Sequence, residues 1–217
     1  MKHQAVMFDL DGTLADTLAD ITSAGNHVLA RLGHPPIEQE RYRYLAGQGA
    51  RSLLRTALGP EKEHLVPEGL AMFRAYYEVH GLDHVRPYRG VPDLVQELTK
   101  RGIRMAILSN KPEAAVHQVV QHLFDDDLFE IARGHLETPG APGLKPDPAG
   151  ALAIANQFEI EPAAWIYVGD TRVDMETAHA ARMFAVGVLW GFRDELELRE
   201  SGAEAIIREP SELLRLL

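Results

Sequence analysis

The 217-residue chain contains no cysteine, which excludes disulfide bonds, cysteine metal ligands and a cysteine nucleophile. It also has no apolar run near the roughly 20 residues that a membrane-spanning helix needs. Its start, Met1-Lys2-His3-Gln4, leads straight into an apolar run, so no signal peptide is expected. These absences predict a cytoplasmic protein with no membrane partner.

Positive charge is scarce, since 22 lysine and arginine residues face 32 aspartate and glutamate residues, for a formal net charge of −10. A protein this acidic is not expected to bind nucleic acid through general electrostatics. An anionic small molecule would need a local positive site made by lysine, arginine, a metal ion or helix N-termini. The hydrophobic fraction of 46% is ordinary for a globular protein of one large or two modest domains.

Short apolar runs alternate with amphipathic stretches along much of the chain. This pattern predicts strands at 6–8, 103–108, 165–168 and 185–189, a weaker one at 128–132, and helices at 91–100, 112–122, 148–158 and 174–183. The alternation is typical of an α/β fold, a doubly wound parallel sheet with a Rossmann-like core. Ligands of such sheets bind at the carboxyl ends of the strands.

Residues 16–85 interrupt this alternation, because they contain no convincing strand. Helices are predicted there at 17–32, 37–45, 50–58 and 61–77, separated by glycine and proline breaks. We therefore predict a small all-helical domain at 16–85, inserted into an α/β core domain made of 1–15 and 86–217.

Two aspartates, Asp9 and Asp11, follow the first apolar run before Gly12 and Thr13 end it. Residues i and i+2 of a strand share one side, so both carboxylates are predicted to point together. Carboxylates that close repel each other unless a proton or cation lies between them, and Mg²⁺ prefers oxygen ligands. A division of labour between a nucleophile and an acid/base is a second interpretation, and solvated aspartates are a third.

Three further motifs carry polar groups at similar places. Ser109 and Asn110 follow the next core strand, where a hydroxyl and backbone N–H groups could hold a phosphate oxygen, or Ser109 could only cap a helix. Lys145 lies between glycine and proline residues that would hold it, although most lone lysines are solvated. Asp170 and Asp174 follow a later strand, where either could merely cap the next helix.

Taken in order, these four motifs resemble those of the haloacid dehalogenase superfamily of phosphohydrolases, over nearly the whole chain. The resemblance implies that the helical insertion is a cap domain and that the core is catalytic. It implies that Asp9 is the nucleophile that becomes an aspartyl phosphate. Asp11 would protonate the leaving alcohol and then activate water, while Ser109 and Lys145 would bind and neutralise the phosphoryl group.

The same resemblance implies a Mg²⁺ cofactor. Its ligands would be Asp9, Asp170 and the backbone carbonyl of Asp11. Asp174 would orient Lys145 or a metal-bound water. The supporting positions are Asp174, Asn110 and Thr13.

Within the superfamily, the segments 45–49, 187–192 and 202–214 resemble phosphoglycolate phosphatases. The implied substrate is 2-phosphoglycolate or a similar small phosphate ester, so the expected partner is a small phosphorylated metabolite. Gly47 and Gly49 could let the backbone approach the substrate, or could only break a helix. We expect a monomer or a homodimer.

The sequence departs from that family at Arg182, where a glycine is usual at the end of a helix. We expect this change to be structural. The loop at 138–144, rich in proline and glycine, is longer than is typical of the family. The acidic run at 125–127 is interpreted as a solvated helix end.

Several alternatives use the same residues. A dehalogenase would not need Asp11, and a sugar-phosphate mutase usually shows valine or a similar residue where Thr13 stands. A nucleotide or pyrophosphate phosphatase stays open, because only the cap separates these substrates. A dinucleotide-binding protein would need Gly-x-Gly-x-x-Gly in place of Asp9 and Asp11. A non-catalytic phosphate-binding or interaction protein would have lost an acidic or lysine position, and none is lost.

Overall fold

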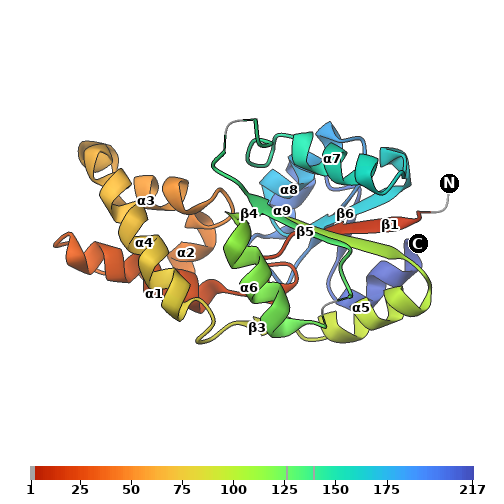
Figure 1. The fold of residues 1–217 in the computed structure, drawn as a ribbon, viewed down its shortest axis with the longest axis horizontal. Coiled ribbons are helices and arrows are strands. Elements are labelled where there is room, and N and C mark those ends of the chain that lie inside the picture. Colours follow the sequence, from red (N-terminus) through yellow and green to blue (C-terminus); the bar gives the residue numbers. More distant parts are fainter. Residues whose placement is uncertain (1–2, 126, 139) are drawn as a thin grey trace.

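The computed structural model describes residues 3–125, 127–138 and 140–217, so the middle of the acidic run and Pro139 of the long loop lie outside the described residues. The core is a six-stranded sheet with the order β5-β4-β1-β6-β7-β8, and its pairings are parallel (Figure 1). Its strands are β1 (Ala5–Phe8), β4 (Arg104–Pro112), β5 (Ile131–His135), β6 (Trp165–Gly169), β7 (Phe184–Val188) and β8 (Ala205–Ile207). The predicted α/β fold class is confirmed, but β8 was not predicted, because three residues at a sheet edge carry little periodicity.

Helices cover both faces of this sheet (Figure 1). One face packs on α5 (Val91–Lys100), α6 (Glu113–Leu123) and η3 (Pro210–Arg215), and the other on α7 (Ala149–Gln157), α8 (Arg172–Ala180) and α9 (Glu195–Glu200). A short turn, η2 (Pro162–Ala164), precedes β6. Along β1, Val6 and Phe8 join the first apolar cluster, whereas Ala5 and Met7 join the second. Burial on both faces explains why β1 is apolar throughout.

The central strand β1 pairs with β4 on one side and with β6 on the other. The chain therefore builds the sheet outward from β1 through β4 and β5, then returns to build β6, β7 and β8. A reversal of strand order leaves a crevice at the carboxyl ends of the strands. Asp9 is the first residue after β1, so it lies at this crevice.

The inserted helical segment lies at one end of the molecule, away from the chain termini (Figure 1). We call it the cap. Its helices are α1 (Leu18–Arg31), α2 (Gln39–Leu45), α3 (Ala50–Leu58), η1 (Pro60–Leu65) and α4 (Val66–His80). They enclose an apolar cluster that includes Leu18, Leu54 and Phe73 and that Phe192 of the core joins. The helix predicted at 61–77 is divided into η1 and α4, because Pro67 favours a helix start.

Two short strands, β2 (Ala15–Asp16) and β3 (Arg86–Pro87), pair antiparallel where the chain enters and leaves the cap. Beside them, the buried Asp20 carboxylate accepts hydrogen bonds from the His84 backbone N–H at 3.1 Å and faces His84 Nδ1 at 2.8 Å. These contacts hold the two connections together. Within the described ranges, no helix combines the length and the apolar character needed to cross a membrane.

Candidate active site

Lys145 lies at the centre of the site and is only 5% exposed. Its ammonium Nζ is 2.8 Å from Asp9 Oδ1 and 2.7 Å from Asp174 Oδ1. Asp9 follows β1, and Asp174 lies in the first turn of α8 after β6. One buried ammonium therefore bridges carboxylates that follow two adjacent strands.

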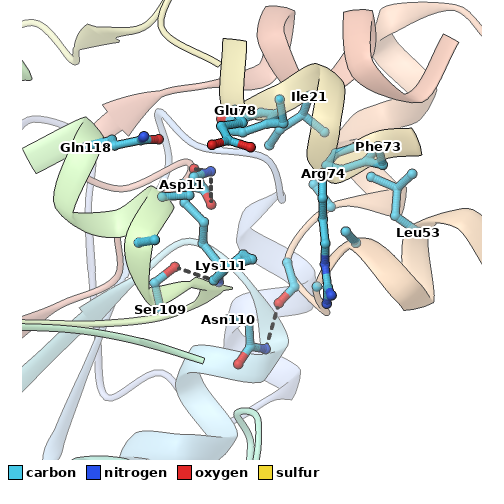
Figure 2. A pocket seen from close by; sticks show the side chains of 18 of the residues that line it. Asp11, Ile21, Leu53, Phe73, Arg74, Glu78, Ser109, Asn110, Lys111 and Gln118 are labelled. Atoms are coloured by element: carbon cyan, nitrogen blue, oxygen red, sulfur yellow. Dashed lines mark hydrogen bonds and ion pairs between the residues drawn. The ribbon is translucent and has the colours of Figure 1, made fainter. Parts of the chain in front are cut away.

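The side chain of Asn110 fixes the backbone of Lys145. Its Oδ1 accepts a hydrogen bond from the Lys145 N–H at 2.7 Å, and its Nδ2 donates to the Lys145 carbonyl at 3.1 Å. Nδ2 also donates to the Gly47 carbonyl of the cap at 3.0 Å (Figure 2). Asn110 thus links the loop that carries Lys145 to the cap.

Three buried carboxylates, those of Asp9, Asp170 and Asp174, have oxygens that lie within 4.8 Å of one another. Asp170 accepts hydrogen bonds from Thr13 Oγ1 at 3.2 Å and from the Phe192 N–H at 2.7 Å. These donors orient the Asp170 carboxylate at the strand ends. The expected ligand carboxylates Asp9 and Asp170 therefore lie together, with Asp174 as a third.

The cluster carries more negative charge than the Lys145 ammonium alone can neutralise. Burial, helped by the charge of Asp174, raises the pKa of the Asp9 carboxyl to about 7. Burial and the charges of Asp174 and Asp9 raise the pKa of Asp170 well above its usual value. Burial alone would lower the pKa of Lys145, but Asp174 and Asp9 hold it well above its usual value. Such a group of hard oxygen donors suits a divalent cation.

Two glycines make room for the Asp170 carboxylate. Gly12 has φ of +90°, and a Cβ there would lie 2.1 Å from Asp170 Oδ2. A Cβ on Gly191 would lie 2.3 Å from Asp170 Cβ. Only glycine therefore permits the turn after β1 to approach Asp170 so closely.

The Asp11 carboxylate pairs with a different ammonium, that of Lys111, whose Nζ lies 2.8 Å from Oδ1 and 3.0 Å from Oδ2 (Figure 2). Asp9 and Asp11 line the same cavity, as the expectation that they point together requires, but each contacts a different lysine. Because β1 ends at Phe8, Asp11 lies in the following turn and strand alternation no longer orients it.

Sequence reasoning did not identify Lys111 as a site residue, although it lies in the second motif. A signal was available, because β4 extends to Pro112 and positions two apart on a strand share one side. Ser109 and Lys111 both line the cavity described next, and the Lys111 N–H donates to Ser109 Oγ at 3.3 Å.

A cavity of about 340 Å³ lies between the cap and the strand ends. The core contributes Asp9, Asp11, Ser109 and Lys111, and Figure 2 shows the cap residues Ile21, Leu53 and Phe73 across from them. The predicted substrate-contacting glycines also line it, with φ of +103° at Gly47 and +82° at Gly49. Any larger residue at these glycines strains the backbone, so a substitution there would not isolate a substrate contact.

The cap rests directly on the core. Arg43 of the cap donates to the Gly191 carbonyl of the core at 2.7 Å, and Arg193 of the core donates to the Ala46 carbonyl of the cap at 3.1 Å. The cavity is therefore bounded by both the cap and the core.

Comparison with known proteins shows what the chain is similar to. Residues 6–188 match the model of a family described as haloacid dehalogenase-like hydrolase. A phosphoglycolate phosphatase of Pseudomonas putida is 37% identical over 194 residues, which cover 86% of this chain and 70% of that protein. An N-acetylmuramic acid 6-phosphate phosphatase of Pseudomonas aeruginosa is 31% identical over 223 residues, which cover 100% of this chain and 96% of that protein.

The crystal structure of a candidate phosphoglycolate phosphatase from Lactobacillus delbrueckii subsp. bulgaricus has a TM-score of 0.92 with this chain at 30% identity. The match covers 98% of this chain and 97% of that one. Sequence and structure agree over the whole fold, core and cap alike. The chain therefore belongs to the haloacid dehalogenase-like hydrolase family, within which its relatives are phosphatases.

Proposed function

We propose that this protein is a Mg²⁺-dependent phosphomonoester hydrolase that acts on 2-phosphoglycolate or a similar small phosphate ester. The observation that carries the proposal is the Lys145 ammonium, which bridges Asp9 and Asp174 within a buried carboxylate cluster at the strand ends. The names of the most similar relatives support the substrate. The cytoplasmic location stays a prediction from composition, and the monomeric or homodimeric state stays an expectation.

In the proposed reaction an Asp9 carboxylate oxygen attacks phosphorus, and the bond from phosphorus to the alcohol oxygen breaks. Asp11 donates its proton to the departing alcohol. A water molecule then attacks the aspartyl phosphate and gives a proton to Asp11, which releases phosphate and restores both carboxyl groups. Lys145 and Ser109 neutralise and orient the phosphoryl oxygens throughout, as phosphoryl transfer requires.

The residues present fit Mg²⁺, since buried carboxylates supply hard oxygen donors and an excess of negative charge. Asp9, Asp170 and the backbone carbonyl of Asp11 would hold the ion. When bound, Mg²⁺ would supply positive charge that stabilises charge on the phosphoryl oxygens.

A panel of phosphate esters, compared by kcat/KM with Mg²⁺, tests this function. We expect 2-phosphoglycolate to be preferred over a nucleoside monophosphate and pyrophosphate, with turnover lost in excess chelator and restored by Mg²⁺. A preference for nucleotides or pyrophosphate would contradict the proposed substrate, but it would be consistent with the proposed phosphatase chemistry. Activity in excess chelator would contradict the proposed dependence on Mg²⁺. If no ester were hydrolysed, the protein would be non-catalytic.

N-acetylmuramic acid 6-phosphate is a second candidate substrate and belongs in the same panel. The relative of that name matches over 96% of its own length, whereas the Pseudomonas putida phosphoglycolate phosphatase matches over 70%. A higher kcat/KM for the sugar phosphate than for 2-phosphoglycolate would favour this alternative.

A further inference from the structure

Lys111 is a buried cation that the proposed reaction does not use. Its side chain is 6% exposed, and it lines the cavity between cap and core. Its ammonium contacts the Asp11 carboxylate and lies 4.6 Å from the centre of the Tyr77 ring. In the proposed reaction the phosphoryl group is neutralised by Lys145, which contacts Asp9 and not Asp11. Lys111 is therefore positioned for the alcohol half of the substrate.

Tyr77 supplies a second polar group at the same place. It belongs to α4 of the cap, lines the cavity and is only 8% exposed. Its hydroxyl oxygen is buried and lies close to the Lys111 ammonium, which interacts with it electrostatically. The hydroxyl keeps hydrogen-bonding capacity that a ligand entering the cavity could use.

The chemistry of the reaction decides what reaches these two groups. If Asp11 protonates the leaving alcohol, the ester oxygen lies beside Asp11, and so close to Lys111. In 2-phosphoglycolate the carboxylate is attached to the carbon that carries this oxygen, which puts its own oxygens about 3 Å away by ordinary bond lengths. An ammonium and a phenol together bind a carboxylate through charge-assisted hydrogen bonds.

We infer that Lys111 and Tyr77 select substrates that carry a carboxylate on the carbon bearing the ester oxygen. The inference rests on the proposed function and names the residues that read the leaving group. The other charged residues that the cap contributes to the cavity are Arg74 and Glu78, and both are exposed. Arg74 is also engaged in an ion pair with Glu137. Solvent screens such charges, so they discriminate less than a buried ammonium does.

The test compares two phosphate esters of similar shape. One is 2-phosphoglycolate, and the other carries an uncharged carboxamide in place of its carboxylate. The readout is the ratio of their kcat/KM values, which cancels any general damage to Asp11. Lys111→Met should reduce the preference for the carboxylate by about 10- to 100-fold. Tyr77→Phe removes only the hydroxyl and should reduce it by about 3- to 10-fold. Lys111→Arg should restore part of the loss.

Arg74→Met is the matched control, because it removes a cation of the same cavity that is exposed and already paired. Its ratio should stay within about twofold of wild type. An equal loss for both esters in Lys111→Met and in Tyr77→Phe would overturn the inference and leave the phosphatase intact. Hydrolysis of neither ester by the wild-type protein with Mg²⁺ would overturn the proposed function itself, before any variant is made.

Discussion

At the scale of single residues, the site separates its carboxylates by giving each its own ammonium. Lys145 contacts Asp9, and Lys111 contacts Asp11. The two aspartates are two positions apart in the chain and yet occupy different electrostatic environments. The two carboxylates therefore differ in their charged partner, although both line the same cavity.

Asp9→Asn should abolish both turnover and the phosphoenzyme, because an amide oxygen is a poor nucleophile. Asp11→Asn should lower kcat by about 10²- to 10⁴-fold, the usual contribution of general acid–base catalysis. Steady-state kinetics and trapping of the phosphoenzyme measure these effects. Wild-type turnover in Asp9→Asn would show that Asp9 is not the nucleophile.

Lys145→Met should lower kcat through lost transition-state stabilisation, and Asp174→Asn should have a smaller effect of the same kind. The two side chains are 2.7 Å apart, so the double variant should be less damaged than the product of the single effects predicts. A double-mutant cycle on kcat/KM measures this coupling. Strictly additive effects would mean that the ion pair has no part in catalysis.

The raised pKa of Asp9, about 7, predicts how pH acts on the metal-free protein. The unfolded carboxyl titrates near 4, so between about pH 4 and pH 7 the folded state binds the extra proton and stability falls as pH rises. Mg²⁺ should therefore raise the Tm more at pH 8 than at pH 5, and Asp9→Asn should flatten the metal-free profile. If Mg²⁺ raised the Tm equally at pH 8 and at pH 5, the prediction would be wrong.

At the scale of elements, the end of β4 supplies three neighbouring groups with different tasks. Ser109 and Lys111 line the cavity, while Asn110 fixes the backbone of Lys145 and contacts Gly47 of the cap. The end of β4 therefore contacts the loop that carries Lys145, the cavity and the cap.

After the end of α8, Arg182 stands where glycine is usual, and this lowers the free energy of unfolding. Its φ is +60°, a left-handed conformation that costs an ordinary residue about 1–2 kcal/mol. Because glycine also loses more entropy on folding, Arg182→Gly should raise the free energy of unfolding by up to about 1 kcal/mol. The gain should appear as a higher Tm with kcat unchanged.

Glu159, with φ of +56°, is the matched comparison for this prediction. Glu159→Gly should change the Tm in the same direction, since the same strain is relieved at the end of α7. A lower Tm in Arg182→Gly would mean that the arginine side chain makes a contribution larger than the strain.

At the scale of the whole molecule, two arginines join the cap and the core, one from each side of the contact. Arg43 reaches from cap to core and Arg193 from core to cap. Closure of this kind excludes water from the reaction and completes the site. The cavity therefore depends on how the cap lies against the core.

Replacing Arg43 and Arg193 together with methionine should favour an open cap and lower kcat/KM for every ester by a similar factor. Small-angle X-ray scattering should then give a larger radius of gyration. Arg55→Met is the control, because Arg55 pairs with Glu63 inside the cap. Unchanged scattering and kinetics in the double variant would show that these contacts do not close the cap.

Local sequence patterns predicted much of this architecture. Short apolar runs identified β1, β4, β6 and β7, and period-3.6 hydrophobicity identified α1 to α8 within a few residues, whereas the short helix α9 and the turns η2 and η3 of the core were not predicted. Parallel strands meet at their carboxyl ends, so Asp9, Ser109 and Asp170 were expected at one edge, and the structure brings them there. Such patterns depend on neighbouring residues alone, which is why the sequence by itself determined them.

Only the tertiary structure decided which side chains pair. Lys111 lies 100 positions from Asp11, and no local pattern indicates that its ammonium contacts that carboxylate. The same holds for Tyr77 beside Lys111, and for the arginines that join cap and core. These contacts depend on how a separately packed helical cap docks on the strand ends. Docking is determined by the shape and charge of two finished surfaces, and neither is a local property of the chain.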